Sequence, residues 1–366
     1  MNKIIITLIF LISPQLVLSN PYMDIDNSTF EKFDISGYLG YRYIWSSIGT
    51  DPVGSYPEAG LLLNYNPTQH ISANMQLNVN RNALEYNMEN ILTYGFLSYQ
   101  NSFGSIPFRV NIGKLRHEFG LYNANIVNPS TRPSGTVAPQ SIYWNNLSST
   151  LTSGYGVHAE VYLGDFKLGY TIDKHIIVDE EQESLMWAGV PVVPMDPYFG
   201  SHQIVNFNYE PNDLPIVVKT SWTRLKLNKD IEDLQFATLG VEYDNNTFSA
   251  SAEILLVRPT HIDWTDIDEL RYGYSISTGY YIWDDFEVHV NANIYENSGI
   301  NQFGLYEDGA DKWKDFSIGA TKYFEDFEVK ADIHKVYGGR VLKPHAFDND
   351  GIDDWWYVGT SIVYHF

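Results

Sequence analysis

The stretch Asp354–Phe366, DWWYVGTSIVYHF, decides the fold of this chain. Its residues alternate between two faces, and from Trp356 onward one face is apolar or aromatic at every position except Thr360. The apolar positions of that face are Trp356, Val358, Ile362, Tyr364 and Phe366. Alternation with a period of two is typical of a β-strand. About ten such residues flanked by aromatic side chains suffice to cross a membrane as one strand of a closed barrel.

The same alternation recurs along most of the chain. In 71–80 the odd positions are apolar and the even positions are Ser, Asn or Gln, and in 327–334 the even positions are all ionisable. A polar face that recurs and carries charge predicts a wet interior. We expect sixteen strands, near 35–45, 59–66, 71–80, 91–101, 107–116, 153–163, 166–173, 202–210, 216–228, 234–244, 247–259, 271–283, 286–298, 313–324, 327–337 and 354–366.

The connections between these strands alternate in length. Tight turns of the hairpin type occur at Gly164-Asp165, Asn245-Asn246, Asp284-Asp285 and Glu325-Asp326. The connections between them are mostly longer, at 46–58, 81–90, 117–152, 174–201, 260–270, 299–312 and 338–353, with 229–233 as a short exception. Short turns at one end and long loops at the other are typical of an even-stranded outer-membrane barrel.

The N-terminus has the features of an export signal. Lys3 precedes an apolar run, and the small residue Ser19 follows it. We expect residues 1–19 to be a signal peptide cleaved near Ser19, 20–34 to be an N-terminal periplasmic segment, and 35–366 to form the barrel. The alternative, a retained N-terminal anchor, is disfavoured because the run is too short for a spanning helix.

Composition excludes several classes of function. The net charge of −22 disfavours nucleic acid as a partner, because its phosphates would be repelled. The chain has no cysteine, so no disulfide holds it together. Aromatic residues make up 15% of the chain, as expected if they form belts at the two membrane interfaces. Nucleophile-elbow, zinc-protease and Walker motifs are absent from the sequence, so we expect neither an enzyme nor a cofactor.

With these features the sequence resembles the Gram-negative outer-membrane porins over essentially all of the mature chain. The resemblance rests on the signal, the sixteen strands, the terminal Phe366 and one outsized loop after the fifth strand. It implies an all-β transmembrane antiparallel barrel, assembly as a homotrimer, and a third external loop, 119–152, that folds inward and narrows the channel. It also implies that Tyr364 and Phe366 form a C-terminal assembly signal for the barrel-insertion machinery.

The region 107–152 is the candidate selectivity site. Arg109 should face the lumen, and a bulge at Gly113 would turn Lys114 and Arg116 inward as well. The loop that follows carries Arg132 and Tyr143 and no acidic residue. Two interpretations stay open. These side chains form a positive constriction that selects ions by charge, or they are ordinary wall and rim charges paired with carboxylates such as Glu118 or Glu160.

Two further groups of residues admit more modest interpretations. Asp348, Asp350 and Asp353 surround Gly351 and resemble part of a calcium loop, but Ala346 stands where a first ligand is needed and no Glu closes the site. We therefore expect an acidic turn and no metal, with a calcium site as the alternative. His158, His289 and His334 fall on lumen-facing positions, and we expect them to be solvated wall residues.

The sequence thus predicts an outer-membrane porin through which small hydrophilic solutes and ions diffuse passively. Its surroundings would be outer-membrane lipid and lipopolysaccharide. The alternatives are a substrate-specific channel for an anion or an oligosaccharide, and a barrel whose external loops serve as an adhesin or receptor. The acidic external loops, with Glu180 and Asp266 among their carboxylates, oppose the basic constriction in sign. The sequence therefore leaves open whether cations or anions are preferred.

Overall fold

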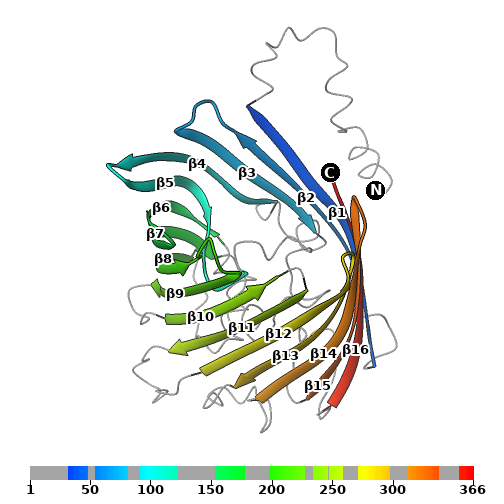
Figure 1. The fold of residues 1–366 in the computed structure, drawn as a ribbon. Coiled ribbons are helices and arrows are strands. Elements are labelled where there is room, and N and C mark those ends of the chain that lie inside the picture. The colour runs from blue at the N-terminus through cyan, green and yellow to red at the C-terminus, as the bar shows by residue number, and fades with distance from the viewer. Residues whose placement is uncertain are drawn as a thin grey trace, which may run out of the picture.

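The protein is a closed barrel of antiparallel strands in the computed structural model (Figure 1). The structure describes residues 32–47, 54–80, 91–122, 153–177, 198–226, 234–245, 247–258, 271–296, 312–337 and 354–366. Each strand pairs with its neighbours in the sequence, and the last strand pairs with the first. Among the described residues, no helix has the length and hydropathy needed to span a membrane.

All sixteen predicted strands are present. In chain order they are β1 (Phe33–Ser46), β2 (Gly54–Tyr65), β3 (Ile71–Asn80), β4 (Leu92–Phe103), β5 (Ile106–Arg116), β6 (Ser153–Leu163), β7 (Phe166–Ile177), β8 (Tyr198–Tyr209), β9 (Ile216–Lys226), β10 (Leu234–Asp244), β11 (Phe248–Arg258), β12 (Arg271–Trp283), β13 (Phe286–Glu296), β14 (Lys312–Tyr323), β15 (Phe327–Tyr337) and β16 (Asp354–His365).

The largest differences from the predicted boundaries lie at the ends away from the short turns. β2 begins at Gly54 rather than near residue 59, although it contains Pro57. Pro57 pairs with Tyr41 of β1, whereas the pairing of β2 with β3 starts only at Glu58. Because β2 is an edge strand at that point, the missing N–H of proline costs no ladder hydrogen bond. β7 and β8 also extend further than predicted, to the pair Ile177 and Tyr198.

The barrel closes where β1 meets β16. Their pairing runs from Tyr38 opposite His365 to Ser46 opposite Tyr357. It continues past the end of β16, because Gly37 N donates to Phe366 O at 2.9 Å and Phe366 N donates to Gly37 O at 3.1 Å. Along this seam, closure leaves neither β1 nor β16 with an open edge that could pair with another chain.

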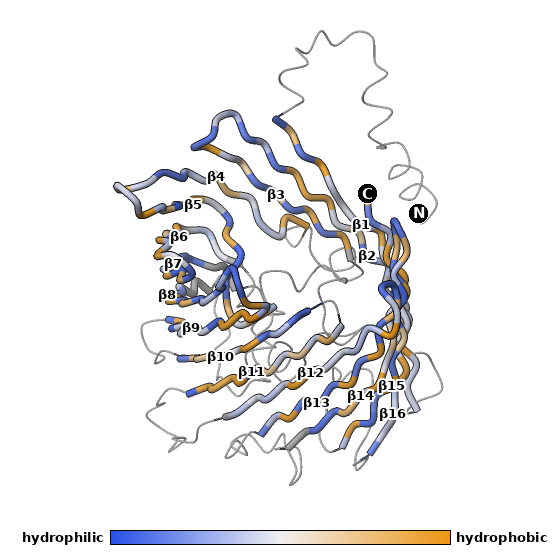
Figure 2. Tube along the Cα trace, viewed as in Figure 1, coloured by the Kyte–Doolittle hydropathy of each residue, from blue (hydrophilic) through white to orange (hydrophobic). Residues whose placement is uncertain are grey.

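The two faces of the sheet differ in polarity, as the alternating colours along the strands show (Figure 2). Outward side chains are largely apolar and exposed, and Trp356, Ile362 and Tyr364 each keep 45–48% of their surface accessible. Inward positions are mostly polar and buried, as at Asn291 and Asn293 of β13. An exposed apolar face this extensive is unfavourable in water and matches a lipid environment.

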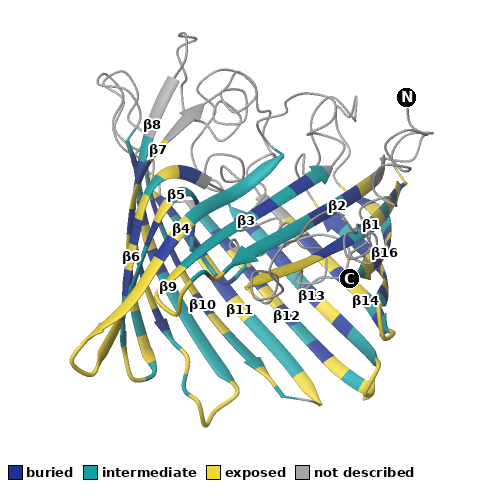
Figure 3. Ribbon diagram, turned by 90° about the horizontal axis from the view of Figure 1, so that it is seen from above, coloured by how far each residue is buried: buried dark blue, intermediate teal, exposed yellow. Residues whose placement is uncertain are grey.

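The short connections gather at one end of the barrel (Figure 3). Those between β6 and β7 and between β12 and β13 consist of two residues each. The connections at the other end are mostly longer by sequence, and that between β5 and β6 is the longest. This alternation confirms the prediction from the sequence.

Candidate lumen site on the inner wall of β5 to β8

A compact charge cluster occupies the inner faces of β5 and β6. Arg109 lies directly opposite Glu160 in the pairing of these strands, and Arg109 Nε is 2.5 Å from Glu160 Oε1. The Glu160 side chain is fully buried, whereas that of Arg109 is 38% exposed. His158 Nε2 lies 3.1 Å from Glu160 Oε2, and the Tyr162 hydroxyl donates to Glu160 Oε1. The buried carboxylate is therefore held by several donors while its arginine partner reaches the lumen.

A second basic and a second acidic side chain extend this cluster. Lys167 Nζ on β7 lies 2.8 Å from Glu118 Oε2 and 3.7 Å from Glu160 Oε2. Asn206 Nδ2 of β8 donates to the same Glu118 oxygen at 2.8 Å. Arg109 and Lys167 are thus matched by two carboxylates, and the cluster is close to neutral.

Further along the same wall, two histidines flank one aspartate. His117 Nε2 contacts Asp173 Oδ2 of β7, and His202 Nδ1 of β8 lies 2.7 Å from Asp173 Oδ1. The two imidazole rings meet edge to face with centroids 4.6 Å apart. All three side chains are fully buried. The cluster joins the chain just after β5 to two strands that are distant in sequence.

The segment that follows β5 crosses the inner wall. Gly120 N donates to Ser221 Oγ of β9 at 3.3 Å, and Leu121 N donates to Glu253 Oε1 of β11 at 2.9 Å. The β5 ribbon can be seen to bend toward the barrel interior in Figure 1. Residues 117–122 are therefore anchored to β7 through β11 from inside the barrel; we call them the anchor segment.

Apolar contacts complete this anchoring. The Phe119 ring packs edge to face against Phe236 of β10, with centroids 6.3 Å apart. Leu121 lies over Gly240, where a Cβ would come within 2.4 Å of Leu121 Cγ. Both side chains are buried, as are Ile204, Leu225 and Leu255 on the same wall. This small apolar core inside a polar lumen gives the anchor segment its own packing energy.

Tyr122 ends the anchor segment beside β10 and β11. Burial raises the pKa of its phenol, the nearby Glu242 carboxylate raises it further, and a hydrogen bond with Ser251 opposes this shift. The phenol therefore stays neutral in the physiological range and acts as a hydrogen-bonding group.

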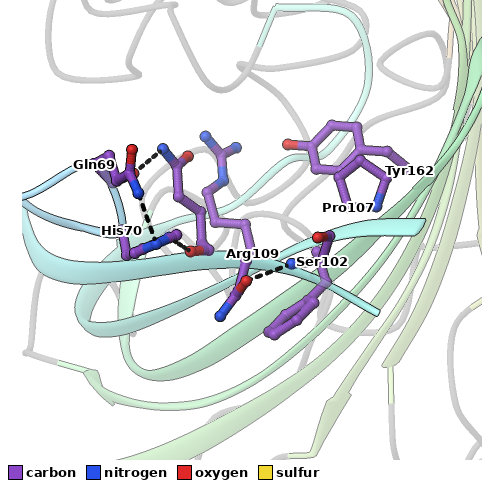
Figure 4. A pocket seen from close by; sticks show the side chains of 9 residues that line it. Gln69, His70, Ser102, Pro107, Arg109 and Tyr162 are labelled. Carbon is purple, nitrogen blue, oxygen red and sulfur yellow. Dashed lines mark hydrogen bonds between the residues drawn. The ribbon is translucent and has the colours of Figure 1, made fainter. Parts of the chain in front are cut away.

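A pocket of about 380 Å³ lies next to the charge cluster, toward the short-turn end (Figure 4). Arg109 and Tyr162 line it from β5 and β6, and Gln69, His70 and Gln100 line it from the β2–β3 turn and β4. Gln100 Nε2 donates to Gln69 O at 2.9 Å, and His70 Nδ1 lies 3.0 Å from Gln100 O. The pocket combines a guanidinium, amides and an aromatic ring.

Lys114 lies on the outer face rather than in the lumen. It stands opposite Tyr155, which is 57% exposed on the outer face, and the register through Gly113 is continuous on both sides. The hypothesis of a β-bulge at Gly113 is therefore wrong. Gly113 instead has a φ of 145°, a conformation that favours glycine. Lys114 Nζ donates to Leu92 O at 2.6 Å and lies 5.9 Å from the Tyr155 ring centroid.

Arg116 turns inward for a different reason. The pairing of β5 with β4 ends at Lys114, while its pairing with β6 continues to Arg116 opposite Ser153. Past Lys114 the strand has left β4, and the guanidinium interacts with the phenols of Tyr94 and Tyr38. Arg116 thus adds a basic side chain to the lumen side, although the alternation of residues along β5 would place it on the outer face.

Of the remaining predicted site residues, some lie outside the described part of the chain and two lie where the barrel closes. Arg132, Tyr143 and the acidic turn with Asp348, Asp350 and Asp353 lie outside the described residues, as does loop 119–152 beyond residue 122. Tyr364 and Phe366 lie in the closing seam, where Tyr364 stands opposite Leu39 of β1.

The contact of His117 and His202 with Asp173 was not predicted from the sequence. Each falls on a lumen-facing position of its own stretch, so parity could have placed them on one wall. Their level along the barrel depends on the registers of the hairpins, which alternation does not determine. The expectation of solvated histidines was wrong, because His158, His289 and His334 are 5%, 2% and 1% exposed.

Comparison by sequence finds no match for the chain, either among protein-family models or among curated proteins. Comparison by structure finds porin-type barrels. Outer-membrane expressed OmpT of Vibrio cholerae matches with a TM-score of 0.60 at 12% identity, over 91% of this chain and 97% of that one. An anion-selective porin from Comamonas acidovorans matches with a TM-score of 0.60 at 12% identity, over 91% and 99%.

Salmonella typhi OmpF, solved in complex with daunomycin, matches with a TM-score of 0.60 at 15% identity, over 94% of this chain and 100% of that one. At such identities the likeness concerns the fold. In strand number, closure and the path of its backbone, the chain has the fold of the 16-stranded bacterial porins.

Proposed function

We propose that the protein is an outer-membrane diffusion channel for small hydrophilic solutes and ions. The observation that carries this proposal is a closed barrel of sixteen strands with an apolar outer face and a polar, charged inner wall. A barrel of sixteen strands encloses more space than its inward side chains fill, so water occupies the interior. Transport is passive and needs no catalytic group.

The narrowest level of the channel is proposed to lie at the anchor segment. Residues 117–122 reduce the open cross-section because they lie against the inner wall of β7 through β11. Arg109 and Arg116 contribute charge there, and Arg132 and Tyr143 would follow if the rest of loop 119–152 continues inward. Lys114 is left out of this set because it shares the outer face with Tyr155.

We further propose that the channel prefers cations. Several basic side chains of the described wall are matched by carboxylates, as in Arg42 with Glu58 at 2.8 Å and Lys330 with Glu328 at 3.5 Å. Other wall carboxylates accept hydrogen bonds from hydroxyl groups, and Glu287 does so from Ser249 and Tyr323. The excess is therefore negative, in line with the net charge of −22. Rings of acidic side chains favour cations in a water-filled pore.

The cellular context follows from the same proposal. Residues 1–19 would direct export and be removed, and the barrel would insert into the outer membrane, in contact with lipid and lipopolysaccharide, by means of the insertion machinery. A matching structure of in-vitro folded Vibrio cholerae OmpT is a trimer form. We propose a homotrimer here too, and the mass of the complex in detergent, measured by light scattering, tests it.

Planar-bilayer recording of the refolded protein under a KCl gradient tests the channel. We expect stable ohmic steps and a reversal potential of the sign that indicates cation preference. A folded barrel that gives no steps would remove the channel proposal. Steps with the opposite sign would keep the channel but place the basic groups in control of selectivity.

A substrate-specific channel for an anion or an oligosaccharide is the second candidate. The pocket beside Arg109 and Tyr162 favours it, because a guanidinium binds carboxylates or phosphates and an aromatic ring can stack on a sugar. Saturable block of the conductance by one class of solute supports this candidate. A current unaffected by any such solute supports general diffusion.

A further inference from the structure

We propose that His117, Asp173 and His202 bind one divalent transition-metal ion, and that zinc is the ion to test. The potential ligand atoms of the three side chains lie within 4.8 Å of one another. All three side chains are fully buried. They come from three separate parts of the chain, so their convergence is a product of the fold and not of local sequence.

The donor set suits such an ion. Two imidazole nitrogens and one carboxylate are ligands that zinc accepts, with a water in the fourth position of a tetrahedron. For bonds of about 2.0 Å, ligand atoms around zinc lie roughly 3.3 Å apart, and the ligand atoms here, all within 4.8 Å of one another, have a similar spacing. Calcium and magnesium prefer oxygen ligands, so two imidazoles select against them.

The neighbouring strand leaves room for the carboxylate. An ideal Cβ on Gly154 would lie 2.4 Å from Asp173 Oδ1, and one on Gly156 would lie 2.6 Å from Asp173 Cβ. A larger residue at position 154 would meet the Asp173 carboxylate itself, and one at position 156 would meet the β7 backbone that carries it, at Ile172 O and Asp173 Cα. Two glycines at successive inward positions therefore hold open the space in which Asp173 meets both histidines.

A second group of ionisable side chains on this wall provides a contrast. Glu118, His158 and Glu160 also bring three ligand atoms within 4.8 Å. There Lys167 and Arg109 already neutralise the carboxylates, at 2.8 Å and 2.5 Å. Among the described residues, the ion-pair partners of Asp173 are the two imidazoles. Imidazole can give up its proton to an incoming ion, whereas arginine cannot and lysine does so only at high pH.

Metal binding would act on the anchor segment. His117 is its first residue, while Asp173 and His202 belong to β7 and β8. An ion held by all three would therefore cross-link the start of this segment to the barrel wall. Binding to the folded state stabilises it in proportion to the logarithm of metal concentration above the dissociation constant.

The test is metal binding by the refolded, untagged barrel, which needs no channel activity. Equilibrium dialysis against Zn²⁺ with elemental analysis should give one ion per chain, and Co²⁺ should give the visible absorption of a tetrahedral site. His117→Ala and His202→Ala should each weaken binding roughly tenfold or more. The matched control is His289→Ala, which removes another buried wall histidine, on β13.

Folding of each variant is checked by its heat-modifiable migration on gels, and Asp173→Asn provides a variant of nearly unchanged shape. Zinc affinity that stays at the wild-type value in His117→Ala and His202→Ala would overturn the site. Absence of any bound ion in the wild-type protein would also overturn it and leave a hydrogen-bonded cluster. Because conductance is not the readout, failure of this site and failure of the channel proposal are separate results.

Discussion

At the scale of single residues, Arg109 is the basic group that is most directly exposed to solutes in the candidate site. Its side chain is 38% accessible, and its partner Glu160 keeps contacts with His158, Tyr162 and Lys167. Removing the guanidinium therefore takes one positive charge from the lumen without leaving the buried carboxylate entirely uncompensated.

We predict that Arg109→Ala shifts the reversal potential toward stronger cation preference. The barrel should lose about 1–3 kcal/mol of stability, because the buried Glu160 carboxylate loses its ion pair with Arg109. Reversal potentials in a KCl gradient measure the first effect. Lys322→Ala is the matched control, because Lys322 pairs with Asp285 at the short-turn end, away from this wall. Equal shifts in both variants would show that total charge, and not the position of Arg109, sets selectivity.

Buried histidines show where residue-scale prediction from sequence fails. The alternation of residues along β6 predicts that His158 faces the lumen, and the structure confirms this. Its imidazole nevertheless lies within 2.8 Å of Thr171 Oγ1 and 3.1 Å of Glu160 Oε2, and is not solvated. Those contacts come from a neighbouring strand and a neighbouring inward residue. A single sequence shows the face of a side chain but not what covers it.

At the scale of elements, the packing of the anchor segment is independent of the hydrogen bonds that hold the barrel together. Its apolar contacts, Phe119 with Phe236 and Leu121 over Gly240, lie on the lumen side of a wall whose stability comes from its own hydrogen-bond ladder. Loss of these contacts should free the segment and leave the barrel folded.

We predict that Phe119→Ala makes the open-channel current larger and noisier. Replacing a buried phenylalanine by alanine costs about 3–5 kcal/mol, and here that cost falls on the docking of residues 117–122. Single-channel recordings measure the change. Phe207→Ala removes a ring from the outer face of β8 and serves as control. A current indistinguishable from wild type in Phe119→Ala would show that the segment does not set the channel width.

The strands themselves were predictable because alternation depends only on local sequence. β3, β6, β10, β12 and β15 have the bounds expected from the pattern. The inward course of Arg116 was not predictable from parity, since it depends on β5 leaving β4 after Lys114. The candidate constriction at 107–152 stays a prediction, because most of loop 119–152 lies outside the described residues. Its contacts with β7 through β11 required the three-dimensional registers.

At the scale of the whole molecule, closure of the barrel depends on close packing at the seam between β1 and β16. An ideal Cβ on Gly37 would lie 2.5 Å from both Gly60 O and the Phe366 ring, whereas one on Gly40 would meet nothing closer than 3.6 Å. The two glycines lie three residues apart on β1 and therefore on opposite faces of the sheet, and both lie beside the C-terminal strand, Gly40 opposite Val363 and Gly37 bonded to Phe366.

We predict that Gly37→Ala lowers the fraction of chains that reach the heat-modifiable folded form, and that Gly40→Ala does not. The methyl group at position 37 meets backbone as well as the terminal ring, so the seam has to shift. Refolding yields in detergent, read from gel migration, measure the effect. Equal yields for the two variants would mean that the seam tolerates the added methyl group.

The same seam has a consequence for the order in which the protein is made. β1 leaves the ribosome early and β16 leaves it last, yet each is the other's pairing partner. Until synthesis has reached Phe366, one edge of β1 has no strand to bond, and an open edge invites aggregation. The barrel therefore cannot close before β16 has been made. Until then, β1 has to be kept from pairing with another strand.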